Sequence, residues 1–329
     1  MNKFSPDSSR SALELSLNSP SIYHPLDGVE ISPARMPGVA HYETGNGRIA
    51  PELFFNGSIC RTSNGKMIFA FRADQKPWWK SIRVGICELN DKLQPLAGTE
   101  QYLALKADNP FHVEDPRLIS VGDRVFVSYT DGKEMYHSEI CQDTLMVKEN
   151  FGKITSFHVT SASPERRDKN FVPFEYNGRV LYSYSDAPRV IIETNGVNDV
   201  YIPGQSAEWE FGHVRGGTPA VKWGNDFVSF FHSSYIVNQV NSLIGQRVYY
   251  MGAYTFSCTP PFSLKKITRV PLMKGVQSRE NTERPTYSFV VFPAGVVQEA
   301  DHFIVSYGVN DLTTRAIRIS KTTLNLLLE

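Results

Sequence analysis

We predict an all-β protein, a five-bladed β-propeller, from three features of the sequence. A segment that reads as strand, tight turn and strand occurs five times along the chain. Its copies start at Asn56, Asp115, Asn170, Gly217 and Pro293, which leaves room for two further strands between neighbouring copies. Four strands per unit, repeated around an axis, form a propeller. The copies also share an equivalent polar start, which the alternative fold, a β-sandwich, would not predict.

The hairpins are predicted by their turn residues. In the copy Asp115–Tyr129, a short apolar run leads to the turn Gly122-Asp123, after which apolar side chains alternate with polar ones. An Asn, Asp or Gly turn between two such strands is the strongest short-range signal of a β-hairpin. Additional strands are predicted between the copies, at Ser81–Leu89, Met135–Ile140, Val248–Phe256 and Arg315–Ile319.

The regions outside the hairpins receive separate predictions. Residues 1–45 are rich in proline, and we expect an irregular N-terminal lead-in that packs on the propeller, which occupies residues 46–329. The polar stretch Ile236–Arg247 is expected to be a long loop or an added helix in the fourth blade. The tail, Thr322–Glu329, either completes the last blade or forms a short helix.

Composition narrows the classes of function. The 34 basic and 34 acidic residues cancel, which argues against nucleic acid or an anionic membrane as a partner. No apolar run approaches the length of a membrane span. The four cysteines lie far apart without metal-ligand spacing, so we expect reduced core thiols in a cytoplasmic protein. With no Gly-rich phosphate loop and no His cluster, we expect no metal and no cofactor. The sequence leaves the oligomeric state open, a homo-oligomer included.

The inner strands of a propeller begin around its central channel, so polar residues at their starts should converge on one pocket. These residues are Asn56, Ser58, Glu114, Asp115, Arg117, Lys169, Asn170 and Arg215. The strands that return to the same rim add Arg72, Asp131, Asp186, His232, Asn310 and Asp311. For Asp131 and Asp186 we favour a role in capping turns.

Charge suggests what this pocket binds. Four cations, Arg72, Arg117, Lys169 and Arg215, would face one or two carboxylates. Such an excess suits a ligand that bears phosphate, because arginine binds phosphate oxygens with two parallel hydrogen bonds.

Six short motifs follow one another in a fixed order across this region. They are Glu114–Arg117, Lys169–Phe174, Arg215–Pro219, His232–Ser234, Val291–Gly295 and Tyr307–Asp311. Each motif is weak alone, but the ordered set, which spans roughly Asn56 to Asp311, resembles glycoside hydrolase family 130. The members of that family are β-mannoside phosphorylases and related mannosidases, and they are five-bladed propellers.

The resemblance implies an enzyme that carries out inverting phosphorolysis. The substrate would be a β-linked manno-oligosaccharide or mannosyl conjugate, the co-substrate inorganic phosphate, and the product mannose 1-phosphate. Asp115 would be the catalytic acid, acting on the glycosidic oxygen through the mannose 3-hydroxyl, while phosphate attacks from the opposite face. The residues implied for the sugar are Asn56, Ser58, Arg72 and Asp311, and we add Glu114, Arg117 and Asn170 as substrate-binding candidates. The residues implied for phosphate are Lys169, Arg215, His232 and Tyr249, with Tyr250 as the alternative tyrosine.

Other functions stay open on the sequence. Family hydrolases use carboxylates to activate water, and Glu208 and Glu210 lie just before Arg215, so an inverting β-mannosidase is one alternative. A mannosyltransferase on the same propeller is another. A carbohydrate-binding propeller without catalysis is the non-enzyme alternative. Trp78 and Trp79 would either stack on a sugar at the pocket rim or belong to a packed loop.

Overall fold

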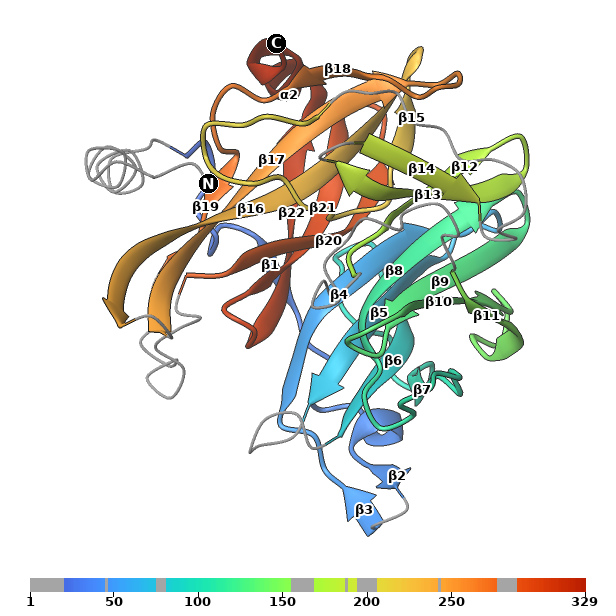
Figure 1. Cartoon of the computed structure of the whole chain (residues 1–329). Coiled ribbons are helices and arrows are strands. Elements are labelled where there is room, and N and C mark those ends of the chain that lie inside the picture. The colour runs from blue at the N-terminus through green and yellow to red at the C-terminus, as the bar shows by residue number, and fades with distance from the viewer. Residues whose placement is uncertain are drawn as a thin grey trace.

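The computed structural model of the chain describes residues 21–44, 47–74, 81–154, 169–186, 189–193, 206–241, 244–276 and 289–329. These residues form successive antiparallel sheets, the blades of a five-bladed β-propeller, which confirms the predicted fold class. Figure 1 shows the blades in chain order, from blue and cyan in the first to red in the last. The ring closes where the first and fifth blades meet, through the parallel pair of Phe54 and Thr313.

The described residues of blades one and two form four strands each, ordered outward from the central channel. Blade one consists of β4 (Leu53–Arg61), β5 (Met67–Asp74), β6 (Ile82–Leu89) and β7 (Gln101–Tyr102). Blade two consists of β8 (Glu114–Val121), β9 (Arg124–Thr130), β10 (Met135–Ile140) and β11 (Val147–Lys153). The strands β6 and β10 confirm two of the four additional strands that were predicted, and β17 (Ile244–Ser257) and β22 (Thr313–Ser320) confirm the other two.

The other three blades repeat this plan with variations. Blade three has β12 (Val172–Tyr176), β13 (Arg179–Asp186) and β14 (Arg189–Glu193). Blade four has β15 (Val221–Trp223), β16 (Asp226–Asn241), β17 (Ile244–Ser257), β18 (Leu264–Ile267) and β19 (Met273–Lys274). Blade five has β20 (Val291–Gln298), β21 (His302–Val309) and β22 (Thr313–Ser320).

Part of the N-terminal lead-in belongs to the propeller itself. The strand β1 (Val29–Ile31) pairs antiparallel with β22 and becomes the outer strand of blade five. The lead-in is therefore regular in this stretch, because the edge of β22 offers unpaired backbone groups that a passing extended segment satisfies. It continues with a 3-10 turn, η1 (Pro37–Val39), and the hairpin of β2 (Tyr42–Thr44) and β3 (Gly47–Ile49). Residues 1–20, 45 and 46 lie outside the described part of the chain.

The prediction of a loop or an added helix at Ile236–Arg247 is wrong. The strands β16 and β17 run through this stretch as one antiparallel ladder, which reaches Asn241 and Ile244. In Figure 1 the two strands extend well beyond the rest of blade four. Strand pairing satisfies the backbone whatever the polarity of the side chains, which is why the polar sequence did not reveal it.

The C-terminal tail forms the short helix α2 (Lys321–Leu327), one of its two predicted alternatives. The hydroxyl of Ser320 caps this helix by accepting a hydrogen bond from the backbone N–H of Thr323. None of the described helices has the length and apolar character of a membrane span.

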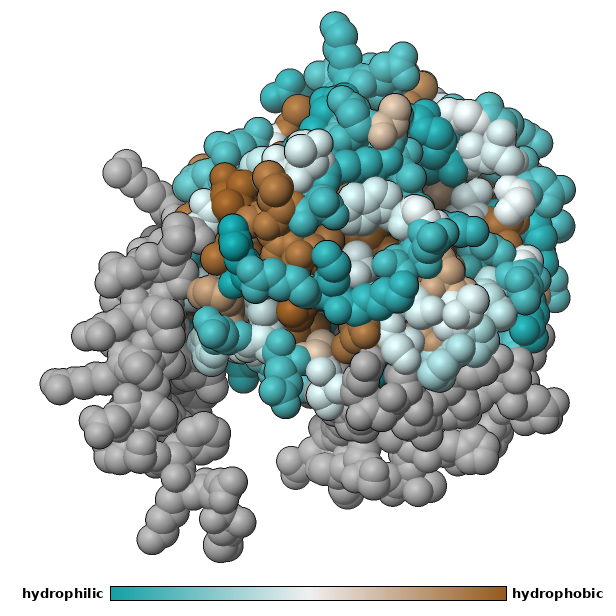
Figure 2. Space-filling model, turned by 90° about the horizontal axis from the view of Figure 1, so that it is seen from above, coloured by the Kyte–Doolittle hydropathy of each residue, from teal (hydrophilic) through white to brown (hydrophobic). Residues whose placement is uncertain are grey.

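The hydrophobic core lies between the blades. All eight residues of β5 are buried, because a middle strand of a blade is covered on both faces by neighbouring sheets. Outward-facing side chains are mostly hydrophilic on the face in Figure 2, with hydrophobic ones in limited groups among them. All four cysteines are free thiols, but only Cys60 and Cys87 are buried, so the expectation of core thiols holds for these two.

Candidate active site

The starts of three inner strands share an unusual backbone conformation. Asn56, Asp115 and Asn170 occupy equivalent positions in the repeat and have φ angles of 49°, 54° and 70°. Asn and Asp are the residues other than Gly that tolerate this left-handed region best. In β4 and β8 a bulge accompanies the turn, since Asn56-Gly57 and Asp115-Pro116 have no partner residue in the ladder. A bulge re-aims side chains, and here it brings those of Asn56 and Asp115 together.

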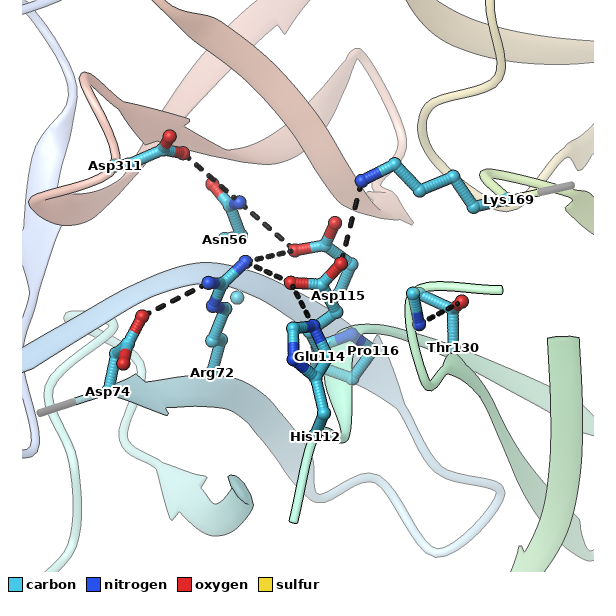
Figure 3. Close-up of polar contacts among 12 residues, drawn as sticks. Asn56, Arg72, Asp74, His112, Glu114, Asp115, Pro116, Thr130, Lys169 and Asp311 are labelled. Atoms are coloured by element: carbon cyan, nitrogen blue, oxygen red, sulfur yellow. Dashed lines mark hydrogen bonds and ion pairs between the residues drawn. The ribbon is translucent and has the colours of Figure 1, made fainter. Parts of the chain in front are cut away.

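Arg72 is the centre of a buried cluster of carboxylates. Its guanidinium donates to Asp74 at 3.0 Å and to Glu114, and its Nη1 lies 3.7 Å from Asp115 Oδ1. The guanidinium carbon also lies 4.7 Å from the centre of the Phe55 ring. Figure 3 shows Arg72 between these three carboxylates. These ion pairs hold Nη1 and Nη2 of the guanidinium, so its positive charge is matched by carboxylates, while its buried Nε has no hydrogen-bond partner among the described residues.

Asn56 links Asp115 to Asp311 on the fifth blade. Its Nδ2 donates to Asp115 Oδ1 at 3.1 Å and to Asp311 Oδ1 at 3.4 Å. Gly308 makes room for this amide, because a Cβ at position 308 would lie 1.9 Å from Asn56 Oδ1. These contacts bring three residues that the sequence analysis assigned to the sugar or to catalysis into one cluster.

Glu114 connects this cluster to blade three. Its carboxylate lies 3.5 Å from Lys169 Nζ and 3.4 Å from His112 Nε2. Burial alone would raise the pKa of Glu114, but the charge of Arg72, the hydrogen bond from His112 and the charge of Lys169 outweigh it and hold that pKa well below its usual range. Glu114 is therefore ionised at neutral pH.

A second group of residues surrounds His232 on blade four. Arg215 and His232 exchange both backbone hydrogen bonds, so their side chains project from the same face of the sheet. His232 is 3% exposed, and its Nδ1 lies 2.7 Å from the carbonyl oxygen of Gly216. Because a carbonyl oxygen only accepts, Nδ1 carries the proton.

The His232 imidazole is neutral at physiological pH. Burial, together with the charges of Arg215, Arg117 and Lys169, lowers its pKa to about 3 against the opposing hydrogen bond to Gly216. With Nδ1 protonated and the ring neutral, Nε2 is a hydrogen-bond acceptor. The imidazole therefore presents an acceptor among cations.

The structure distinguishes the two candidate tyrosines. Tyr249 stacks beside His232, with ring centroids 6.0 Å apart and an interplanar angle of 20°. Tyr250 pairs with Ser233, points to the opposite face and is fully buried against Phe211. Tyr249 is therefore the tyrosine on the His232 side.

Three residues expected at the sugar lie in the contacts between blades. Ser58 is fully buried, and its hydroxyl accepts the backbone N–H of Leu118 at 3.0 Å, which joins blades one and two. Arg117 is 1% exposed and donates to backbone carbonyls. Asn170 is half-buried, and its carbonyl approaches Gly216 so closely that a Cβ there would lie 1.8 Å from it. The side chains of Ser58 and Arg117 are therefore part of the wall of the channel.

The expected excess of cations over one or two carboxylates is wrong for the side of the site around Arg72. Asp74, Glu114, Asp115 and Asp311 all lie close to that arginine. Sequence reasoning missed Asp74 and His112. Each lies two residues from a predicted site residue and therefore on the same side of an extended chain, which is the signal that could have found them.

Other predicted residues have simpler outcomes. Asp131 caps a turn, as predicted, by accepting the backbone N–H groups of Lys133 and Glu134. The side chain of Asp186 and residues Trp78 and Trp79 lie outside the described part of the structure. Within that part, no group of three or more His, Cys, Asp or Glu residues could hold a metal ion.

Comparisons with known proteins agree with this geometry. A family model described as β-1,4-mannooligosaccharide phosphorylase, that of glycoside hydrolase family 130, matches residues 31–329. No curated protein matches the chain at a significant level.

Solved structures resemble the chain in fold. A β-1,2-mannobiose phosphorylase from Listeria innocua, in complex with β-1,2-mannobiose, has 17% identity and a TM-score of 0.59 over 84% of this chain and 92% of that one. A mannose phosphorylase from Leishmania mexicana, in complex with phosphate, has 14% identity and a TM-score of 0.54 over 96% and 92%. A glycosyl hydrolase from Bacteroides ovatus has 15% identity and a TM-score of 0.62 over 90% and 94%.

Proposed function

The chain belongs to glycoside hydrolase family 130 and is an enzyme of the β-mannoside phosphorylase type, and we propose that Asp115 is its catalytic acid and that Arg215, His232 and Tyr249 bind its phosphate. One observation carries the proposal: the site has two unlike sides. The acidic side is the closed network of Asn56, Arg72, Asp74, Glu114, Asp115 and Asp311. The cationic side consists of Lys169, Arg215 and His232, with Tyr249 beside the imidazole.

The acidic side suits a neutral sugar and a proton transfer. Asn56 and Arg72 hold the Asp115 carboxyl in one place, which is what a general acid needs to reach the leaving oxygen. In the proposed reaction a phosphate oxygen bonds to C1 of mannose as the bond from C1 to the glycosidic oxygen breaks. That oxygen takes a proton from the mannose 3-hydroxyl, which takes one from Asp115. Asn56 and Asp311 contact the same mannose.

The cationic side suits the phosphate. The Arg215 side chain is exposed, so an entering anion can reach it. The Nε2 of neutral His232 accepts a hydrogen bond from the P–OH of hydrogen phosphate.

The experiment is a comparison of product release from β-linked manno-oligosaccharides with and without phosphate. We expect mannose 1-phosphate, formed only when phosphate is present. Free mannose released at equal rates in both conditions would overturn the phosphorylase assignment.

The position of Glu208 favours phosphorolysis over hydrolysis. An inverting hydrolase needs a base carboxylate about 6.5–9.5 Å from its acid. Glu208 instead lines a surface pocket with the outer strand β18 and Glu329. Glu210 is exposed as well. No carboxylate of the cationic side among the described residues takes the role of that base.

We also propose a cytoplasmic location, because all four cysteines are free thiols and reduced thiols are typical of that compartment. The expectation that the enzyme needs no cofactor beyond phosphate stays a prediction.

A further inference from the structure

We infer that Arg117 is a positioning residue that holds the Asp115 turn in its reactive conformation, rather than a residue that binds sugar or phosphate. The inference rests on the proposed role of Asp115 as the acid.

The Asp115 backbone is strained. Its φ of 54° lies in the left-handed region, which costs a residue other than glycine roughly 1–2 kcal/mol. Pro116 follows directly, and the residue before a proline is pushed toward extended conformations. A doubly disfavoured conformation persists only where the surroundings enforce it, and such strain is typical of active sites.

Arg117 supplies that enforcement. Its Nη1 donates to the carbonyl oxygens of both Asp115 and Pro116, at 3.0 and 3.2 Å. These are the two residues without a partner in the β8–β9 ladder, because the bulge takes them out of register. The guanidinium thus folds back over the turn and satisfies the carbonyls that the bulge leaves outside the sheet.

The same guanidinium is anchored to two other blades. Its Nε donates to the carbonyl oxygen of Gly217 at 2.5 Å, at the start of blade four. Its central carbon lies 4.8 Å from the centre of the Phe292 ring on blade five. Arg117 therefore ties the turn that carries the acid to the opposite wall of the channel.

The cost of this arrangement argues for a function. Burial lowers the pKa of Arg117 to about 10, with Asp115 opposing that shift, so the guanidinium is still charged at neutral pH. No carboxylate among the described residues forms an ion pair with it, and its Nη2 lacks a hydrogen-bond partner there. A buried cation with incomplete partners is a poor source of stability, so holding the turn explains it better than packing does.

The test compares two buried arginines with similar contacts. Arg117→Ala removes the clamp. Arg189→Ala is the matched control, because Arg189 is also fully buried, donates Nε to a backbone carbonyl (that of Phe262) and lies over an aromatic ring, Phe256, between blades three and four. Both variants should melt at a lower temperature than the wild type.

Only the loss of the clamp should affect catalysis. We expect Arg117→Ala to lose about 10²-fold in kcat, the cost of displacing a reacting group by about 1 Å, with the KM values for mannoside and phosphate nearly unchanged. Guanidinium ion, added well below denaturing concentrations, should restore part of kcat in Arg117→Ala and none in Arg189→Ala. Arg117→Lys, which keeps one donor, should lie between Arg117→Ala and the wild type.

Three results would overturn the inference. A raised KM for phosphate or mannoside with kcat retained would make Arg117 a binding residue. Equal losses of kcat in Arg117→Ala and Arg189→Ala, with no rescue by guanidinium, would make it merely structural. If Arg117→Ala does not fold, Arg117→Lys takes its place in the test. A kcat equal to that of the wild type in Arg117→Lys would contradict the proposed positioning role. If the wild type turns over without phosphate, the phosphorylase proposal fails, but kcat of the variants relative to the wild type still tests Arg117.

Discussion

The acidic and cationic sides of the site differ in how their charged groups are partnered. On the acidic side, every charge has a partner: Arg72 is held by Asp74 and Glu114, and Asp115 by Asn56. On the cationic side, the Arg215 side chain is exposed, and the buried His232 imidazole is neutral, a state that burial and the surrounding cations both favour. Lys169 interacts with both sides, through Glu114 and through the electrostatic effect on His232.

The difference indicates what each side binds. Carboxylates outnumber the single arginine of the acidic side, so this side does not attract an anion, but it holds hydrogen-bonding groups rigidly for a neutral sugar. An unsaturated cluster of cations is costly until an anion arrives, so it favours phosphate. Substitutions on the acidic side should therefore change kcat, and those on the cationic side should change the KM for phosphate.

Removal of the acid should have the largest effect. Asp115→Asn keeps the shape of the side chain and its contact with Asn56 but has no proton to donate to the leaving group. We expect kcat to fall by about 10²–10⁴-fold while the variant still binds mannoside, measured by steady-state kinetics and calorimetric titration. Wild-type kcat would remove Asp115 from catalysis. A large fall in melting temperature with loss of sugar binding would make its role structural.

Gly308→Ala should disturb the same side without touching a charge. The new Cβ would lie 1.9 Å from Asn56 Oδ1, so the amide that holds Asp115 has to move. We expect kcat to fall by up to about 10²-fold, with the KM for phosphate unchanged. Gly85→Ala is the control, because its Cβ would meet the Phe71 ring in the core of blade one; it should lower the melting temperature and leave kcat intact. If Gly308→Ala and Gly85→Ala had the same kcat, Asn56 would not be needed to position the carboxyl of Asp115.

Arg215→Ala tests the cationic side. Loss of a charge-assisted hydrogen bond of about 1.5–3 kcal/mol should raise the KM for phosphate roughly 10- to 150-fold, with the KM for mannoside unchanged. Lys222→Ala is the control, since Lys222 is an exposed cation that lines a separate cavity with Glu175 and Gln298. An equal rise of the KM for phosphate in both variants would mean that the effect comes from the net charge of the protein rather than from Arg215 itself.

The sequence allowed the ring of blades and most site residues to be predicted, because both follow from local patterns. Hairpin turns and polar strand starts are visible in the sequence, and a propeller brings such starts together. The role of each residue depended on register and side-chain reach instead. Asp74 reverses the expected charge balance around Arg72 only because β5 places both side chains on one face. Arg117 turns back onto its own strand because of a bulge that no pattern of polarity reveals.

Sulfate should be a poor competitor of phosphate. At neutral pH sulfate carries no proton, so it offers His232 Nε2 a lone pair where hydrogen phosphate offers a P–OH donor. An unsatisfied contact of this kind costs about 1–3 kcal/mol, so we expect the inhibition constant of sulfate to exceed the KM for phosphate by roughly 5- to 150-fold. Arsenate, which keeps the hydroxyl, should replace phosphate in turnover. Tight inhibition by sulfate would mean that His232 donates rather than accepts.

The dependence of protein stability on acidic pH also tests the cationic side, with the smallest expected effect. Because the pKa of His232 is about 3, against about 6.5 for an unperturbed histidine, the unfolded chain takes up a proton below about pH 6.5 that the folded chain refuses. This residue therefore contributes a loss of stability as pH falls from about 6.5 toward 3, which amounts to about 2 kcal/mol at pH 5. His232→Gln removes the contribution, so the fall in melting temperature between about pH 7.5 and 5 should be a few degrees smaller than in the wild type.

His137→Gln is the control, because the pKa of His137 is lowered by burial to about 4 and its ring packs against Phe151 between blades two and three. This variant should also show a smaller fall in melting temperature, while kcat and the KM for phosphate stay unchanged. If the melting temperature of His232→Gln falls as much between these pH values as that of the wild type, the imidazole is not held neutral in the folded protein. The cationic side would then lack the neutral acceptor that distinguishes it from the acidic side.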